Sequence, residues 1–309
     1  MEQKKKFHFI GIGGSLMHKI AIALKELGHT ITGSDDEIVD PSRSKLLNSN
    51  LLPASTGWHP ERIDKSLDVV IFGRHTLKDN PELLKSQQLG LKVYTCPEYI
   101  YEYSFDKQRI VVVGSQGRNM VASMMIHVLR YHNRQVDHVI STSSGKEFTV
   151  KLSKAPVIII DGSESPSTTL YHTPQFIKYK QHIGILTEIA WNPDTSNLNE
   201  NDFIRQYDLF ADTTPKGGML IYKESDKIAA VICNKERPDV LYIPYKAHAS
   251  VVEAGKDFLI GSDNKHVPVQ LSGKQNFQYF SAAYEALKKI GITSEQFYKA
   301  IPSFKGIVD

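Results

Sequence analysis

The sequence has 309 residues, of which 41% are hydrophobic and 23% charged, with 37 Lys and Arg against 34 Asp and Glu. Such a chain can bury a full core and form about two domains, which excludes a disordered segment, a collagen-like fibre and a small disulfide-bonded protein. Its basic residues are scattered, so we expect no nucleic-acid partner. No apolar run is long enough for a membrane span or a signal peptide, so we expect a cytoplasmic protein. Cys96 and Cys233 lack C-x-x-C spacing, and we expect both to be reduced and structural.

Short apolar runs alternate with helical patterns along the chain. Strands are predicted at residues 7–12, 30–33, 68–72, 91–94, 110–113, 157–160, 183–187, 219–222, 229–233 and 240–243, and helices at 17–27, 81–89, 121–129 and 280–290. This alternation predicts an α/β fold with parallel, doubly wound sheets. The polar segment 103–108 separates two such units. We therefore expect a Rossmann-like domain over residues 1–106 and a second domain over 107–309.

A first glycine turn, Gly11-Ile-Gly13-Gly14-Ser15, lies between the first predicted strand and its helix. Glycines allow the backbone to approach a diphosphate held at a helix N-terminus. Asp35 follows the second strand, where a carboxylate suits a ribose hydroxyl. Leu16 fills the third glycine position of G-x-G-x-x-G, so these residues alone leave open both a nicotinamide cofactor and a purely structural turn.

The wider context of this turn resembles the N-terminal domain of the Mur ligases. The resemblance rests on H-F-I-G-I-G-G-S-L-M at 8–17, G-S-D-D-E at 33–37 and D-N-P-E-L at 79–83, and it extends over essentially the whole chain. It is closest to the murein peptide ligase branch of that family. It implies that the turn holds the diphosphate of a UDP-N-acetylmuramate-type nucleotide rather than NAD. The implied contacts are Gly11, Gly13, Gly14, Ser15 and Met17 at the diphosphate, Asp35 at the uridine end, and His75 and Asn80 in a further loop, where ordinary solvated residues are an equal alternative.

A second glycine turn opens the second predicted domain, where the resemblance implies an ATP-binding loop of the form G-x-x-G-K-T/S-T/S. Arg118 replaces the lysine of that loop, and its planar fork makes different contacts from a compact ammonium group. Asn119 lacks the hydroxyl that ligates Mg²⁺ in the family. The backbone can still bind phosphate or sulfate without reaction, an ordinary turn being the alternative. The candidate phosphate-site residues are Gly114, Ser115, Gln116, Gly117, Arg118, Asn119 and, from a later segment, Asn276.

Other landmarks of the family are retained only in part. Glu164 keeps a carboxylate that the resemblance assigns to a second Mg²⁺, as a weak metal ligand here. Pro193 stands where the family has a metal-binding histidine, and Lys223 where it has an adenine-side asparagine. In 273–279, only Gly273 and Asn276 persist from G-x-H-N-x-x-N. Loss of one such group lowers phosphoryl-transfer rates by about 10²–10⁴, and the groups act as a unit, so we predict that no catalytic set is intact.

Two sets of side chains outside these motifs also have predicted places. Tyr99, Tyr101 and Tyr103 are expected to pack the domain junction. His127, His132 and His138 lack metal-ligand spacing and are expected to be polar surface residues.

The chain ends with P-S-F-K-G-I-V-D at 302–309, which resembles the stretch before the third domain of Mur ligases, so we expect the C-terminal ligase domain to be absent. The leading hypothesis is a degenerate family member of peptidoglycan biosynthesis or recycling. It binds a UDP-N-acetylmuramate-type nucleotide but makes no productive use of the ATP and Mg²⁺ of the family. The first alternative is a functional ATP-dependent ligase that joins peptide to UDP-N-acetylmuramate, with unusual nucleotide contacts or a third domain in trans. The second is a nicotinamide dehydrogenase.

Overall fold

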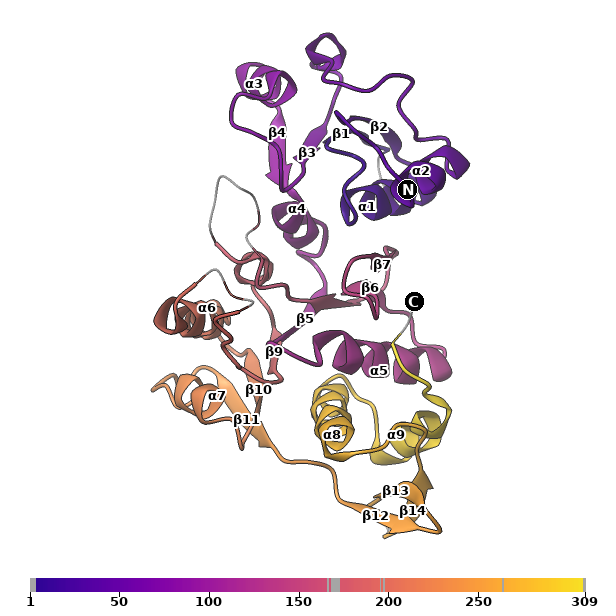
Figure 1. Ribbon diagram of the computed structural model, residues 1–309, viewed down its shortest axis with the longest axis vertical. Coiled ribbons are helices and arrows are strands. Elements are labelled where there is room, and N and C mark those ends of the chain that lie inside the picture. Colours follow the sequence, from indigo (N-terminus) through magenta and orange to yellow (C-terminus); the bar gives the residue numbers. More distant parts are fainter. Residues whose placement is uncertain are drawn as a thin grey trace.

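The computed structural model describes residues 4–165, 167, 173–194, 196, 198–262 and 264–307. Within these ranges the chain forms two sheets of mainly parallel strands, each flanked by helices, and a small antiparallel sheet (Figure 1). The α/β class predicted from the sequence is confirmed. The chain leaves the first sheet region at α4 (Cys96–Tyr103) and enters the second at β5 (Gln108–Val113). The predicted boundary after residue 106 falls in the segment between these elements.

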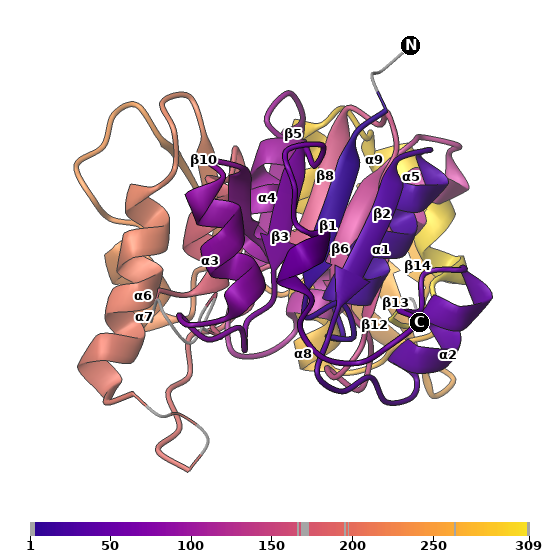
Figure 2. The ribbon, with the colours of Figure 1, turned by 90° about the horizontal axis from the view of Figure 1, so that it is seen from above.

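The N-terminal sheet has the strand order β2-β1-β3-β4, with every pair parallel. Its strands are β1 (Lys6–Ile10), β2 (Thr30–Ser34), β3 (Val69–Phe72) and β4 (Lys92–Thr95), and its helices are α1 (Met17–Glu26), α2 (Ser42–Asn48), η1 (Pro60–Arg62), α3 (Pro81–Gln88) and α4. All four residues of β3 are buried, which is typical of a parallel strand covered on both faces. Figure 2 shows α1, α3 and α4 around this sheet.

Local sequence signals fix where the helices of this domain begin. Asn80 caps α3 by accepting hydrogen bonds from the amides of Glu82 and Leu83, and Pro81 occupies the first helical position. Thr95 and Glu98 form a reciprocal capping box at the start of α4. These caps place the segments that follow β3 and β4 at the carboxyl edge of the sheet.

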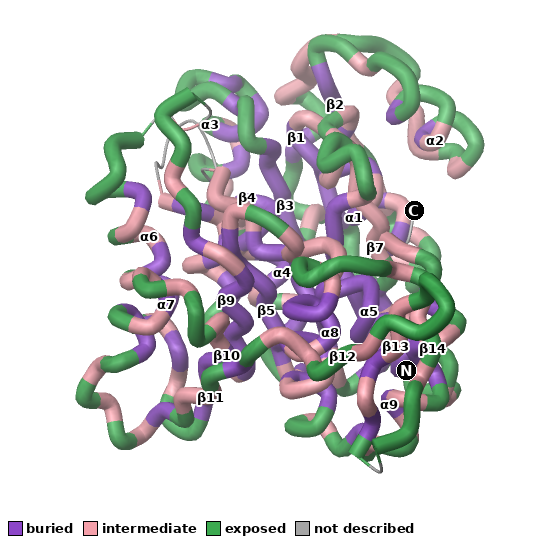
Figure 3. Tube along the Cα trace, turned by 60° about the horizontal axis from the view of Figure 1, so that its bottom comes forward, coloured by how far each residue is buried: buried purple, intermediate pink, exposed green. Residues whose placement is uncertain are grey.

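The second sheet has the order β11-β10-β9-β5-β8-β6-β7, in which only the β6–β7 pair is antiparallel. The strands after β5 are β6 (Asp137–Ser141), β7 (Phe148–Lys151), β8 (Val157–Asp161), β9 (Ile183–Leu186), β10 (Met219–Lys223) and β11 (Leu241–Tyr245). Along β5, Ile110 and Val112 belong to one apolar cluster and Val111 and Val113 to another, as the two-residue period of a strand requires. Figure 3 shows the buried residues along these central strands.

Helices cover both faces of the second sheet. α5, α8 and α9 lie with the cluster of Ile110, whereas residues of η2 and α6 join the cluster of Val111, which extends into the N-terminal domain. The bounds are α5 (Arg118–Tyr131), η2 (Gln175–Tyr179), α6 (Glu200–Asp212), α7 (Lys227–Ile232), α8 (Lys274–Lys289), α9 (Ser294–Ala300) and η3 (Ile301–Ser303). The small sheet comprises β12 (Ser250–Glu253), β13 (Lys256–Ile260) and β14 (His266–Pro268), far from the N-terminal domain in Figure 1.

Two sequence expectations are wrong. The predicted strand 229–233 is helical, because Asp226 caps the amides of Ile228 and Ala229 and starts α7 there. A short apolar run does not distinguish the two states by itself. His138 is not a surface residue, since it lies buried in β6 with 3% exposure. Burial lowers the pKa of its imidazole to about 3, and the histidine is therefore neutral.

The domain junction contains the predicted tyrosines. The Tyr103 hydroxyl donates to Asp137 and to the Ser153 carbonyl, and Tyr101 packs its ring against the Arg109 guanidinium. Tyr99 belongs to the cluster that continues from one sheet to the other. Cys96 and Cys233 are buried and free, as expected. No helix in the described ranges is long and apolar enough to span a membrane.

Candidate functional site

A cavity of about 930 Å³ lies between the two large sheets. One wall comes from segments that follow β1, β2 and β3, at the edge of a parallel sheet where ligands commonly bind. The opposite wall comes from the turn between β6 and β7 and from the segment after β8. The lining includes every residue predicted for the muramate nucleotide, namely Gly11, Gly13, Gly14, Ser15, Met17, Asp35, His75 and Asn80. The structure thus brings this set together, and its role in binding stays a prediction.

The first glycine turn is held open toward the cavity by its own backbone bonds. The amide of Gly11 donates to the Ser34 carbonyl at 2.8 Å, and that of Gly14 donates to the Gly11 carbonyl at 3.2 Å. Gly11 has a φ of +82°, a conformation that favours glycine. A side chain at Gly13 would lie 2.9 Å from Asp35 and 3.2 Å from Ile38. The turn therefore requires glycine for both conformation and space.

Asp35 connects the end of β2 to this turn. Its Oδ2 accepts the Gly13 amide at 2.7 Å, and the residue is 9% exposed. Burial, followed by the hydrogen bond with Asp36, raises the pKa of Asp35 to about 6. The carboxylate thus has one oxygen committed to the turn, while the residue still lines the cavity.

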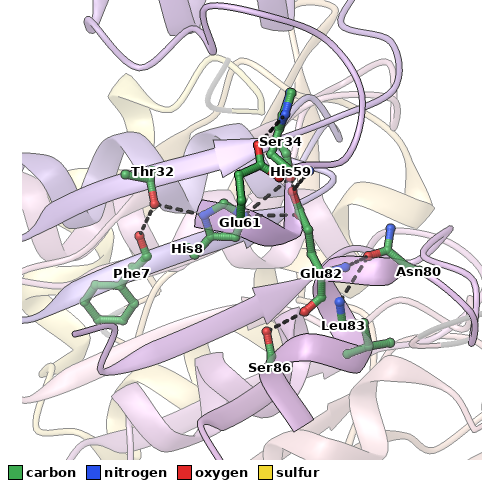
Figure 4. A network of polar contacts seen from close by, with 10 residues as sticks. All are labelled: Phe7, His8, Thr32, Ser34, His59, Glu61, Asn80, Glu82, Leu83 and Ser86. Atoms are coloured by element: carbon green, nitrogen blue, oxygen red, sulfur yellow. Dashed lines mark hydrogen bonds and ion pairs between the residues drawn. The ribbon is translucent and has the colours of Figure 1, made fainter. Parts of the chain in front are cut away.

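A buried polar network lies behind this wall (Figure 4). The Glu82 carboxylate accepts hydrogen bonds from the Ser34 hydroxyl and from the His59 amide, the latter at 2.6 Å, and contacts His8 Nε2 at 3.2 Å. His8 Nδ1 bonds in turn with the Thr32 hydroxyl at 2.9 Å. The network ties β1, β2 and α3 together beside the cavity. Asn80, whose side chain caps α3, is committed to the same scaffold.

The opposite wall was not predicted from the sequence. Gly145, Lys146 and Phe148 come from the β6–β7 hairpin, and Ser163, Ser165, Ser167 and Gln175 come from the region after β8. An ion pair of 2.9 Å between Lys45 of α2 and Glu147 joins this hairpin to the N-terminal domain. Only the pairing of β6 with β7, which the sequence pattern did not reveal, brings Lys146 to the cavity.

The second glycine turn is bonded to the end of β9. The Ser115 amide donates to the Glu188 carbonyl at 2.6 Å, and the Thr187 hydroxyl donates to the Gln116 carbonyl at 2.6 Å. Gly117 has a φ of +80°, and a Cβ there would overlap the ring of Tyr279 in α8. This turn is thus packed beneath a tyrosine ring and committed to protein partners.

Arg118, the first residue of α5, turns back over this loop. Its Nη1 donates to the Gly114 carbonyl at 2.7 Å, and its Nε donates to Asp161 Oδ1 at 2.8 Å. Nη1 also lies 3.6 Å from Glu164 Oε2. Burial by itself lowers the pKa of the guanidinium, but the carboxylates of Asp161 and Glu164 outweigh this effect and raise it. Arg118 is thus a permanent cation inside the loop.

The remaining predicted residues of the second site have other partners. The side-chain amide of Asn119 donates through Nδ2 to the Thr142 carbonyl at 3.1 Å. The side-chain amide of Asn276 donates through Nδ2 to the Ser272 carbonyl at 2.7 Å. Gln116 accepts a hydrogen bond from Gln275 at 2.9 Å. Lys223 forms an ion pair of 2.9 Å with Glu188 beside a smaller cavity of about 410 Å³. Where the family resemblance implies adenine contacts, this chain places a charged pair.

Comparison with known proteins relates this chain to the Mur ligases. A model described as "Mur ligase family, catalytic domain" matches residues 6–104. The chain is 24% identical to UDP-N-acetylmuramate–L-alanine ligase of Caldicellulosiruptor bescii and 25% identical to that of Aquifex aeolicus, over 97% and 98% of this chain and 67% of each relative. The chain is thus similar to Mur ligases along nearly its whole length, and the family model itself matches its N-terminal third. The chain spans about two thirds of the length of these relatives.

Solved structures of Mur ligases share the fold. A murein peptide ligase from Neisseria meningitidis aligns with a TM-score of 0.81 and 19% identity, over 99% of this chain and 100% of that chain. A murein peptide ligase from Psychrobacter arcticus aligns with a TM-score of 0.79 and 18% identity, over 98% of this chain and 69% of that chain. The fold that the resemblance implies is therefore confirmed.

The side chains of the second site do not fit the Mg²⁺ that the resemblance implies. Asp161 already bonds to Arg118 and, through Oδ2, to the hydroxyl and amide of Ser141. Glu164, the predicted metal ligand, accepts the Tyr207 hydroxyl on one oxygen and faces Arg118 with the other. Across the part of the chain that the structure describes, no group of three or more His, Cys, Asp or Glu side chains is placed to hold a metal ion.

Proposed function

We propose that this Mur ligase family protein binds a UDP-N-acetylmuramate-type nucleotide in the cavity between its two domains and does not catalyse ATP-dependent amide-bond formation. Its role would be one of binding or regulation in peptidoglycan biosynthesis or recycling. The observation that carries the proposal is the contrast between the two glycine turns. The first opens onto a large cavity, whereas Arg118 and Tyr279 close the second.

The first turn supports nucleotide binding through its geometry. Gly13 and Gly14 line the cavity together with Ser15 at the start of α1, where backbone amides and the helix dipole favour a diphosphate. Arg74 and Lys146 reach the same cavity from opposite walls and are both exposed. An anionic ligand between the walls would therefore face a cation from each domain. The volume of about 930 Å³ is at the upper end of typical ligand pockets and suits a nucleotide sugar.

The second turn supports the loss of ligation. Amide formation by the family requires positioning of the ATP phosphates and neutralisation of their charge. Here the Ser115 amide is bonded to Glu188, and the carboxylates that would hold a metal are bonded to Arg118. ATP would have to displace several buried or charge-assisted hydrogen bonds to enter, and such bonds contribute about 1.5–3 kcal/mol each.

Calorimetric titration of the full chain with UDP-N-acetylmuramate tests the binding half of the proposal. We expect saturable binding with one site per chain, and no comparable heat with MgATP or NADH. A folded protein that gives no heat with UDP-N-acetylmuramate would remove this half. Saturable binding of NADH at the same turn would instead support the nicotinamide alternative.

A further inference from the structure

The carboxylates at the end of β8 form a cluster that shares one cation from within the chain. Asp161 is the last residue of β8 and its side chain is 3% exposed, while Glu164 lies three residues later and is 28% exposed. Each of their four oxygens has a partner. Asp161 uses Arg118 on Oδ1 and Ser141 on Oδ2, and Glu164 uses Tyr207 on Oε1 and Arg118 on Oε2.

A buried carboxylate needs a compensating cation, because transfer of an isolated charge out of water is strongly unfavourable. In a site of this kind the compensating charge can come from a divalent ion or from a side chain. Lys223, another cation near the loop, is already paired with Glu188. Arg118 is therefore the side chain that supplies the charge to Asp161.

The shape of arginine matches this task better than the shape of lysine. The planar fork of Arg118 directs Nε to Asp161 and Nη1 to the Gly114 carbonyl, so that one side chain joins two segments that a single ammonium group would bridge less well. Gly114 follows β5 and Asp161 ends β8, and these two strands are paired. The contact thus closes the loop onto the neighbouring strand.

We propose that the Arg118 guanidinium takes the place of a divalent cation, pairing with both Asp161 and Glu164, offsetting part of their charge and holding the second glycine turn in its closed form without nucleotide or metal. The consequence is a loop that keeps its shape in the absence of ATP, and a carboxylate pair that does not recruit Mg²⁺. Removal of the guanidinium would free the two carboxylates for a metal ion. This inference deepens, and rests on, the part of the proposed function that concerns the loss of ligation.

The test uses Mn²⁺ as a spectroscopic probe for a divalent cation on the full chain. Mn²⁺ binding is measured by electron paramagnetic resonance, and thermal unfolding is followed with EDTA and with Mg²⁺. The variants are Arg118→Gln, which keeps a side chain able to donate hydrogen bonds, Arg118→Ala, and the double variant Arg118→Gln with Asp161→Asn. Arg134→Gln is the matched control, because Arg134 donates to the Ile290 and Gly291 carbonyls, away from the carboxylates.

We expect the wild type and Arg134→Gln to bind no Mn²⁺ in the low millimolar range and to unfold at the same temperature with and without Mg²⁺. Arg118→Gln should unfold about 5 °C or more below wild type in EDTA, bind one Mn²⁺ and regain part of the difference with Mg²⁺. The double variant should lose the Mn²⁺ site. If Arg118→Ala does not fold, the proposal is tested with Arg118→Gln, which keeps a hydrogen-bond donor at this position.

Three outcomes would overturn the inference. The first is Mn²⁺ binding by the wild type that the double variant lacks. The second is an Arg118→Gln variant whose unfolding temperature and Mn²⁺ binding respond to metal no more than those of the wild type. The third is retention of the Mn²⁺ site in the double variant. These results are separable from the proposed function, because nucleotide titration and ligation assays on the wild type are independent of the variants. If the Mn²⁺ experiment gives one of these three outcomes while the wild type shows no ligation, only the proposal that Arg118 replaces a divalent cation is refuted.

Discussion

The Asp35 carboxylate accepts the Gly13 amide at 2.7 Å, which ties the end of β2 to the glycine turn at the start of α1. This contact spans 22 residues of sequence and closes one wall of the cavity between the domains. Because the acceptor is a carboxylate, the turn is coupled to its protonation state.

Asp35→Asn should make stability less dependent on pH. Burial raises the pKa of Asp35 to about 6, so the folded state binds its proton more tightly than the unfolded chain does. The contribution of this group to stability is therefore fully present below about pH 4 and is lost as the pH rises to about 6. Denaturant unfolding followed by circular dichroism should give Asp35→Asn a higher free energy of unfolding than the wild type at pH 7.5. This difference in free energy should become smaller toward pH 4.

Asp64→Asn provides a control of opposite sign for this experiment. The pKa of Asp64 is lowered by hydrogen bonds from Ser66, so ionisation of this carboxylate favours the folded state. Replacement should leave stability unchanged or slightly lower at pH 7.5. A wild type whose stability rises steadily between pH 4 and 6, with Asp35→Asn following the same curve, would contradict the assigned direction.

Glu82→Gln should destabilise the N-terminal domain by about 2–4 kcal/mol, because it leaves partners of a buried carboxylate unsatisfied. Burial by itself raises the pKa of Glu82, but the hydrogen bonds from His8, Ser34 and the His59 amide together lower it. The stabilising contribution of Glu82 is thus present near neutral pH and lost as the pH falls through this lowered pKa.

Glu61→Gln is the matched control for Glu82, because Glu61 contacts the ring of the same His59 at 3.2 Å but is 67% exposed. We expect a change within about 0.5 kcal/mol, as for most surface ion pairs. Equal effects of the two substitutions in urea denaturation would mean that the buried network contributes no more than a surface pair.

Gly117→Ala should destabilise the protein by more than Gly90→Ala. Both glycines have positive φ, at +80° and +68°, so each alanine is strained by its backbone. Only at Gly117 does the new Cβ overlap the Tyr279 ring, whereas Gly90 has open space. We expect losses of about 1 kcal/mol at Gly90 and about 2–4 kcal/mol at Gly117 by chemical denaturation.

A variant pair of Gly117→Ala and Tyr279→Leu should recover part of that loss, since the ring is removed. An equal cost at the two glycines would show that Tyr279 does not pack against the loop in solution.

Lys146→Ala should weaken the binding of UDP-N-acetylmuramate about 10-fold, which corresponds to roughly 1.4 kcal/mol. Lys146 lines the cavity, whereas Lys151 of the same hairpin is exposed and does not. Lys151→Ala should therefore bind as the wild type does in calorimetry. Added salt should reduce the difference between the two variants, because exposed charges are screened. A Lys146→Ala variant with wild-type affinity would place the ligand away from the hairpin.

The sequence predicts one wall of the cavity because that wall is encoded locally. Gly11, Gly13 and Asp35 follow predicted strands, and the carboxyl ends of parallel strands meet at one edge of a sheet. The opposite wall depends on strand pairing. Ser144 and Gly145 mark a turn before Lys146, but a turn signal alone does not show that β7 pairs with β6. Long-range pairing of this kind is not visible in local periodicity.

The contact of Arg118 with Asp161 likewise depends on long-range strand pairing that local sequence patterns do not show. Arg118 is visible in the sequence as a departure from the loop motif of the family, but its separation of 43 positions from Asp161 conceals that paired strands bring the two side chains to 2.8 Å. The strand prediction at 229–233 is wrong because the start of α7 depends on the Asp226 cap, and the apolar run that follows is compatible with either state. In each case the deciding contact involves atoms outside the segment that was interpreted.

The proposed function requires that nucleotide binding persists without ligation. The most direct measurement incubates the full chain with UDP-N-acetylmuramate, an L-alanyl-γ-D-glutamyl-meso-diaminopimelate tripeptide and MgATP, and follows both phosphate release and the mass of the nucleotide product. We predict that UDP-N-acetylmuramate is recovered unchanged, with no phosphate release above a protein-free control, at concentrations where calorimetry shows the site to be filled. A UDP-linked tripeptide formed together with stoichiometric phosphate would contradict the proposed loss of ligation.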